Sequence, residues 1–228
     1  MNQNQRTAGL TLIELLVIIA IIAFFVAMIH TPSSHAKSKA QRISCVNNLK
    51  QVGLGFRVWA SDHDEKFPME VSFTNGGAME TLASGDLVSV FEVMSNELNT
   101  PKILYCPADY SLKIQASAFG RTSRSVHGYA SIPFSGNSNV TYFVGMDAKT
   151  NLPSAFLSGD DNFLVGTNAA KSGILSLTTN SPVAWSKTRH EKQGNIGLAD
   201  GSVQGFSSSA LRKALANTGV ETNRLVMP

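Results

Sequence analysis

The sequence of 228 residues has few charges and no basic stripe. Nineteen Lys and Arg against 16 Asp and Glu give a formal net charge of +3, and the basic residues beyond Arg57 are scattered. Because nucleic-acid-binding proteins gather their basic residues on one face or helix, no nucleic-acid partner is predicted. Only Lys37, Lys39 and Arg42 form a cluster. Its position shortly after a long apolar run favours contact with lipid headgroups or a subunit interface.

The patterns of common enzymes are also absent. His190 and Asp200 have no third metal ligand at a recognisable spacing, and no nucleophile stands beside them in an elbow or triad context. We therefore predict that the chain is not an enzyme and has no cofactor. Asp160 and Asp161 are weak candidates for calcium, because calcium takes oxygen ligands from loops. The competing interpretation of these two residues is a solvated turn.

Cysteine is scarce, with Cys45 and Cys106 alone in the chain. An exported domain would permit a disulfide between them, which would tie an N-terminal helix to the rest of the protein. Two buried free thiols are the alternative. Spacing does not decide connectivity, so both interpretations stay open.

What the sequence does contain is an apolar run from Leu10 to Ile29. Thr11 and Glu14 alone interrupt it, and Glu14 is its sole charge. A helix of about 20 apolar residues matches the hydrocarbon core of a bilayer. A carboxylate there costs roughly 2.5–3.5 kcal/mol on insertion scales. We therefore predict a transmembrane helix over residues 10–30 and a specific partner for Glu14.

The segment Gly9–Leu16 (Gly-Leu-Thr-Leu-Ile-Glu-Leu-Leu) resembles the processing site of type IV prepilins and type II secretion pseudopilins. In that family, prepilin peptidase cuts after the glycine and methylates the new amino terminus. The resemblance implies a leader over residues 1–9 and a methylated Leu10, although most relatives have Phe there. Glu14 lies one turn after Leu10 on the same helix face. It would meet the cationic amino terminus of a neighbouring subunit and set the register of assembly.

Two other interpretations of the N-terminal segment fit the sequence less well. A secretory signal peptide has its small residues after the apolar core, whereas Ala8 and Gly9 precede it. An ordinary membrane anchor needs no glutamate at this spacing. The flanking charges conflict with the family's orientation, because more basic residues follow the run than precede it. The processing motif is the more specific signal, so we expect a single-pass protein of the inner (cytoplasmic) membrane with its head in the periplasm.

The rest of the pattern predicts an α+β fold. A long N-terminal helix, half transmembrane and half amphipathic, would pack on a small antiparallel sheet as in pilins. The amphipathic half is expected from Ala36 to about Ala60, within a stalk over 31–62, and the head over 63–228. The stripe predicted to face the core is Ile43, Cys45, Val46, Leu49, Val52, Phe56 and Trp59. Further elements are predicted as helices at 86–98 and 207–217, strands at 103–106, 140–146 and 163–167, and a long loop at 117–139.

A second signature lies near the C-terminus, where His190 precedes Asp200-Gly201 with nine residues between. Residues 190–201 resemble the H-X9-DG domain of many prepilin-like proteins of planctomycetes and verrucomicrobia. Residues 45–51 and 105–109 resemble two further motifs of that group, so the likeness runs along nearly the whole chain. Asp200-Gly201 favours a two-residue type I′ turn, with Leu198 opposite Val203. His190 is expected to hydrogen-bond near this hairpin.

The resemblance implies a structural subunit of a pilus or secretion filament. Its partners would be prepilin peptidase, other pilin or pseudopilin subunits in a homopolymer, the inner membrane and the secretion or pilus assembly platform. The alternative is a membrane-tethered periplasmic module that does not polymerise. Its Ser-, Gly- and Asn-rich loops would then capture a polysaccharide or another surface ligand.

Overall fold

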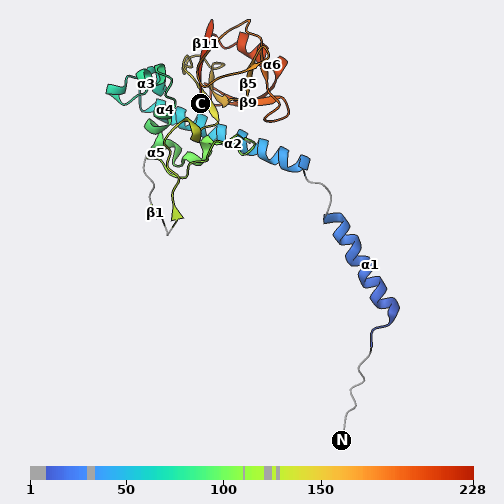
Figure 1. Cartoon of the computed structure of the whole chain (residues 1–228). Helices are drawn as coiled ribbons and strands as arrows, with labels where there is room; N and C mark the ends of the chain where they lie inside the picture. The colour runs from blue at the N-terminus through green and yellow to red at the C-terminus, as the bar shows by residue number, and fades with distance from the viewer. Residues whose placement is uncertain (1–8, 30–33, 110, 121–124, 127–128) are drawn as a thin grey trace. The chain divides into compact units, whose positions relative to one another are not determined.

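The computed structural model describes residues 9–29, 34–109, 111–120, 125–126 and 129–228 (Figure 1). Contacts divide the chain into two compact units, residues 1–37 and 38–228. The predicted leader, apart from Gly9, lies outside the described residues, and so do residues 30–33, where the membrane and stalk segments were predicted to meet.

The first unit contains helix α1 (Leu12–Ile29). The large apolar side chains that the structure describes here are exposed, from Leu10 to Val26. Among the described residues, no helix has both the length and the apolar character that crossing a membrane requires. The transmembrane span over 10–30 therefore stays a prediction, and its last residue lies outside the described part of the chain.

The second unit begins within α2 (Ser34–Ser61), so most of the predicted stalk belongs to the same unit as the head. The helix buries an apolar stripe at intervals of three and four residues, as predicted. The buried members are Cys45, Leu49, Val52, Phe56 and Trp59. Ile43 is 60 % exposed, so its assignment to the stripe was wrong. It precedes Cys45 by two residues, which places it on nearly the opposite side of a helix with 3.6 residues per turn.

Short helices follow α2. They are η1 (Pro68–Glu70), η2 (Phe73–Asn75), α3 (Met79–Ala83), α4 (Val88–Val93), α5 (Ser95–Leu98) and η3 (Pro101–Leu104). The helix predicted over 86–98 is thus two short helices that meet at Met94. The strand predicted over 103–106 was wrong, because residues 103 and 104 belong to η3 and the structure assigns no strand to 105 and 106. Pro101 suits the first turn of a helix, and the Thr100 side chain accepts a hydrogen bond from the Lys102 amide at 3.4 Å.

The head is built on a six-stranded sheet in the order β10-β9-β4-β3-β11-β7. Each neighbouring pair is antiparallel. The strands are β3 (Tyr142–Gly145), β4 (Phe156–Asp160), β7 (Gly173–Thr178), β9 (Gln193–Leu198), β10 (Val203–Ser207) and β11 (Thr222–Met227). A long N-terminal helix followed by an antiparallel sheet confirms the predicted α+β class.

Smaller elements complete the head. A three-stranded antiparallel sheet contains β6 (Asn168–Ala169), β5 (Phe163–Val165) and β8 (Val183–Trp185). The stretch predicted as a long loop holds the pair β1 (Ser125–Val126) and β2 (Tyr129–Ala130), and η4 (Asn137–Asn139). The terminal helix α6 (Ser208–Ala216) begins after Ser207, whose side chain accepts a hydrogen bond from the Ala210 amide.

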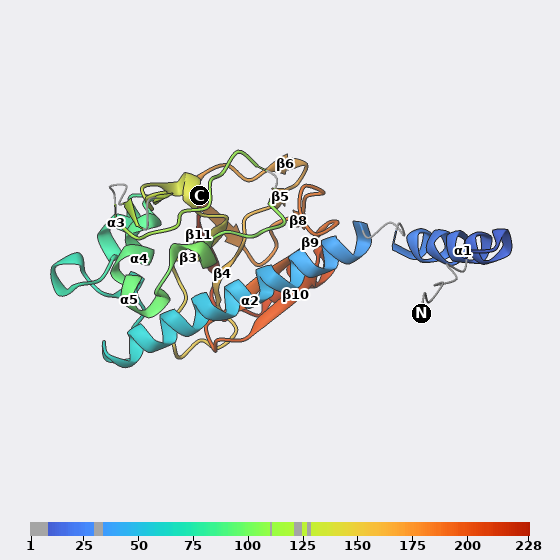
Figure 2. The same ribbon diagram turned by 90° about the horizontal axis from the view of Figure 1, so that it is seen from below.

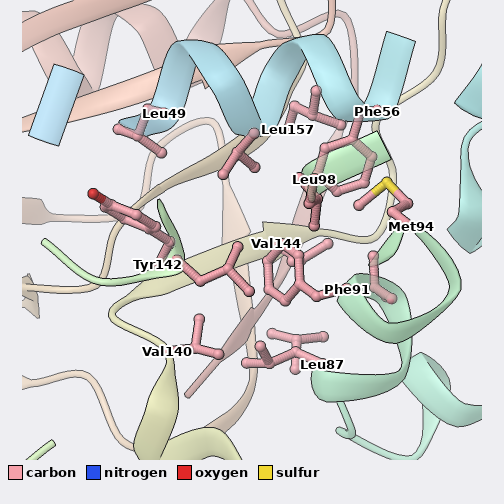
Figure 3. Close-up of a cluster of buried hydrophobic side chains, with 14 of the residues drawn as sticks. Leu49, Phe56, Leu87, Phe91, Met94, Leu98, Val140, Tyr142, Val144 and Leu157 are labelled. Carbon is pink, nitrogen blue, oxygen red and sulfur yellow. The ribbon is translucent and has the colours of Figure 1, made fainter. Parts of the chain in front are cut away.

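Both faces of the large sheet are covered. On one face α2 and the short helices α4 and α5 enclose a core in which Phe56 and Phe91 lie near Val144 (Figure 3). On the other face α6 packs with Trp185 and Phe163 in a second core. Successive residues of β3 therefore alternate between the two cores, which is why all four are buried. Figure 2 shows α2 lying along β9 and β10.

Candidate functional site

The predicted cleavage point lies at an open position of the first unit. Leu10 is 70 % exposed, and a Cβ atom placed on Gly9 would have nothing within 4 Å. A peptide bond in such a position is accessible in this chain taken by itself.

Glu14 has a local partner that the sequence argument missed. Its carboxylate accepts hydrogen bonds from the Thr11 amide and the Thr11 hydroxyl, each at 2.8 Å. The Glu14 amide in turn donates to the Thr11 hydroxyl at 3.3 Å. This reciprocal pair is a capping box at the start of α1, and the Thr-x-x-Glu spacing was a signal for it.

Leu10 lies two residues before α1 begins, so the helix face that Leu10 and Glu14 were expected to share stays a prediction. Together with Ile13, Val17 and Ile18 they line a single hollow. An acidic group therefore sits among apolar side chains one turn from the amino terminus that cleavage would create.

In the head, the three short motifs meet around one disulfide. Cys45 of α2 is bonded to Cys106, with 4.9 Å between their Cα atoms. The Asn48 side chain also donates to the Tyr105 carbonyl at 2.9 Å. Residues 45–51 and 105–109 are thus joined covalently and by a hydrogen bond.

His190 lies against this disulfide. Its Nε2 atom is 3.5 Å from the Cys106 sulfur and 3.4 Å from Oδ2 of Asp160. The residue is only 8 % exposed. The same Asp160 oxygen accepts hydrogen bonds from the Asn195 amide at 2.7 Å and from its side-chain nitrogen at 2.9 Å. His190 therefore contacts β4 and the disulfide rather than the turn of the hairpin.

Arg189 is the cation of this buried centre. Its guanidinium is 2.6 Å from Asp161, 3.1 Å from Asp109 and 3.7 Å from Asp160, and it donates to the Thr141 carbonyl at 3.0 Å. Burial lowers the pKa of Arg189, but the three carboxylates outweigh it and leave the pKa raised. The group thus stays charged.

The pKa of the Asp109 carboxyl shifts in the opposite direction. Burial raises the pKa of Asp109, but Arg189 and the hydrogen bonds from Ser111 outweigh burial and leave that pKa lowered. Burial first, and then the nearby Asp160, raises the pKa of the Tyr142 phenol well above its usual range. Asp161 also pairs with Lys113 at 2.6 Å. The two calcium candidates thus have protein cations as partners, and calcium binding stays a prediction.

The backbone at this centre is unusual. His190, Glu191 and Lys192 have φ values of 50°, 54° and 63°, in the left-handed region that non-glycine residues seldom adopt. Such positions cost on the order of 1–3 kcal/mol each and persist where the surroundings hold them. Here the ion pairs of Arg189 and the contacts of His190 stabilise this backbone conformation.

The Asp200-Gly201 end of the motif forms a different turn from the predicted one. Val203 pairs with Gly197, and the Leu198 amide donates to the Ser202 carbonyl at 2.8 Å, which leaves three residues, 199–201, in the loop. A type I′ turn needs positive φ at both central residues, but only Gly201 has it, at 87°. The predicted pairing of Leu198 with Val203 was therefore wrong by one residue. A Cβ on Gly53 of α2 would lie 3.7 Å from the Gly201 carbonyl, so this turn packs on α2.

Beside the ion pairs lies a hollow of about 490 Å³. Its lining includes the charged residues Asp109, Lys113, Asp161 and Arg189. From the sequence, Arg189 and Lys113 were not singled out. Neither residue belongs to a periodic pattern of basic residues, so no local signal pointed to them.

Comparison with known proteins bears on the first unit. Residues 4–29 match the family model described as the prokaryotic N-terminal methylation motif. No curated protein and no solved structure matches the chain. The match supports a type IV pilin-like or pseudopilin-like precursor, as the resemblance around Gly9 implied. The resemblance to the H-X9-DG group stays a prediction.

Proposed function

We propose that this chain is a structural subunit of a type IV pilus-like or type II secretion filament. Prepilin peptidase would cut between Gly9 and Leu10 and methylate Leu10, and the mature chains would polymerise through their N-terminal helices on an assembly platform in the inner membrane. The observation that carries this proposal is the methylation-motif match over residues 4–29.

The exposure of the apolar side chains of α1 supports the proposal. Its apolar side chains are exposed in the single chain, and a helix that is apolar all round is stable only when lipid or other helices cover it. Before assembly the bilayer would cover residues 10–29, and in the filament the helices of neighbouring copies would do so.

The disulfide supports a periplasmic head. Bonds such as Cys45–Cys106 form and persist in oxidising compartments and are rare in the cytosol. This argues for the orientation that the processing motif implies and against the one that the flanking basic residues favour.

The processing step is tested on the mature protein from membranes. We expect its mass and N-terminal sequence to begin with methylated Leu10. Retention of residues 1–9 in the finished product would overturn the proposal, because no free amine would then stand opposite Glu14.

The role of Glu14 is tested by separating its charge from its capping contacts. Glu14→Gln keeps an acceptor for the Thr11 amide but removes the charge, whereas Thr11→Ala removes the capping hydroxyl and keeps the charge. We expect Glu14→Gln and Glu14→Ala to be processed normally but to give few filaments. Thr11→Ala should lose only about 0.5–2 kcal/mol of helix stability and should still assemble. Equal filament yield from Glu14→Gln and wild type would refute the charge role.

We also propose that the head has no enzymatic activity. A hydrolase that used His190 would need this side chain open to its substrate, whereas it is buried against the disulfide and Asp160. His190→Gln should therefore lower stability. Turnover of a substrate that this variant loses while it stays folded would contradict the proposal.

A periplasmic binding module that does not polymerise is the second candidate. The hollow of about 490 Å³ favours it, because charged groups and apolar residues line it together, as in many ligand sites. Cross-linking of intact cells distinguishes the two functions. A ladder of homo-oligomers is expected for the filament, and one adduct with a foreign partner is expected for the module.

A further inference from the structure

The side chains around the disulfide also have the composition of a metal site. Ligand atoms of Cys45, Cys106 and His190 all lie within 4.8 Å of one another, and all three residues are buried. Asp160 adds a carboxylate oxygen 3.4 Å from Nε2 of His190. Two sulfurs, one imidazole nitrogen and one carboxylate oxygen are a donor set that zinc accepts.

The spacing of these atoms agrees with a tetrahedral ion. Zinc bonds of about 2.3 Å to sulfur and about 2.0 Å to nitrogen or oxygen place a sulfur about 3.5 Å from a nitrogen, and a nitrogen about 3.3 Å from an oxygen. The structure has Cys106 and His190 at 3.5 Å, and His190 and Asp160 at 3.4 Å. The two sulfurs must also separate, which breaking the disulfide allows.

The Asp160 carboxylate also has the hydrogen bonds that a metal-ligating carboxylate normally has. Ligating carboxylates are normally held by further hydrogen bonds, and Asp160 already accepts two from Asn195. The other oxygen of Asp160 is buried and has no hydrogen bond, although it lies 3.7 Å from Nη1 of Arg189. The backbone of His190 is in the left-handed region, with φ 50°.

We propose that the reduced chain binds one Zn²⁺ through Cys45, Cys106, His190 and Asp160. A phosphine reductant and one water break the S–S bond, giving two thiols and the phosphine oxide. Zn²⁺ then displaces the two thiol protons and forms two Zn–S bonds, while the neutral imidazole and the carboxylate complete the coordination. Disulfide and zinc are alternative cross-links between α2 and the head. The site does not depend on whether the chain polymerises.

The test uses the full chain in detergent, reduced with a phosphine under an oxygen-free atmosphere. Co²⁺ serves as a spectroscopic substitute for zinc. We expect one cobalt per chain, with the visible bands of a tetrahedral ion and a thiolate-to-cobalt charge-transfer band. One equivalent of Zn²⁺ should abolish both. The oxidised chain should show neither, because its sulfurs are bonded to each other.

Variants assign the ligands. Cys106→Ser and His190→Gln should each weaken zinc binding by at least about 10–100-fold, since even changes outside the ligand shell have that effect. His63→Gln is the matched control, because His63 stacks on Trp59 and should leave affinity unchanged. Reduced wild type that shows no charge-transfer band, folded or not, would overturn the proposal. A His190→Gln variant with the metal affinity and the spectrum of wild type would also overturn the proposal. If that variant does not fold, the presence or absence of the charge-transfer band in reduced wild type decides the proposal.

Discussion

At the scale of the residue, Arg189 forms ion pairs with three aspartates, of which Asp160 is fully buried. Its guanidinium contacts Asp109, Asp160 and Asp161, and its side chain is 4 % exposed. Removing one partner of a buried ion pair leaves uncompensated charge in a medium of low dielectric constant. The stability of the head should therefore depend on this side chain far more than on a surface cation.

The variant Arg189→Met tests this dependence. We expect the free energy of unfolding to fall by about 3–5 kcal/mol, measured by urea denaturation of the full chain in detergent. Lys187→Met, at an exposed position two residues earlier, is the control and should change stability by less than about 0.5 kcal/mol. A loss below about 1 kcal/mol for Arg189→Met would show that the ion pairs stabilise little.

Asp109 predicts how stability depends on pH. Its pKa is lowered on folding, so the folded state binds its proton less readily than the unfolded state. The resulting stability is present above the ordinary carboxyl pKa of about 3.9 and is lost as pH falls through the lowered value. Urea denaturation between acid and neutral pH should show this loss. Asp109→Asn should be less stable at neutral pH, and its stability should change less steeply in acid. Parallel curves for the two proteins would contradict the assignment.

At the scale of the element, the β9–β10 hairpin depends on one glycine. Gly201 has φ 87° and follows Asp200, whose carboxylate accepts a hydrogen bond from the Ser202 amide at 2.8 Å. Gly201→Ala should lower the free energy of unfolding by about 1–3 kcal/mol, because a Cβ is strained in that region. Ser202→Ala keeps the donating amide and should be nearly neutral in the same denaturation experiment. Equal stability of the two variants would mean that the loop relaxes without cost.

The helices show which elements a sequence pattern can predict. The apolar stripe of α2 was predictable because helical periodicity is a local property, and five of its members are buried. The type and the boundaries of a short element were less predictable from the sequence. Residues 103–106 have the apolar composition of a strand, but Pro101 and the Thr100 cap start a 3-10 turn instead. Local hydrogen bonds decide the conformation of this turn, although its Leu104 carbonyl also accepts a hydrogen bond from Thr141, the residue before β3.

At the scale of the whole molecule, the disulfide links α2 to the head across 61 residues of chain. Closing a loop of that length restricts the unfolded chain and stabilises a protein by about 2–5 kcal/mol. Replacing both Cys45 and Cys106 with Ser should lower the free energy of unfolding by that amount. A phosphine reductant in metal-free buffer should destabilise wild type similarly and should not affect the double variant. If the reductant also destabilised the double variant, the reductant would be acting at a site other than this disulfide.

The sequence by itself determined the N-terminal segment, because the apolar run, the small residues before it and the single glutamate are all local features. It also determined the α+β class and the helical period of α2, since both follow from patterns within a few turns of chain. Only the tertiary structure decided that Cys45, Cys106, Arg189 and His190 share one buried centre. Those residues are separated by up to 145 positions, from 45 to 190, and no periodicity relates them. Their meeting follows from the antiparallel order of the sheet and its packing on α2, which a linear pattern does not encode.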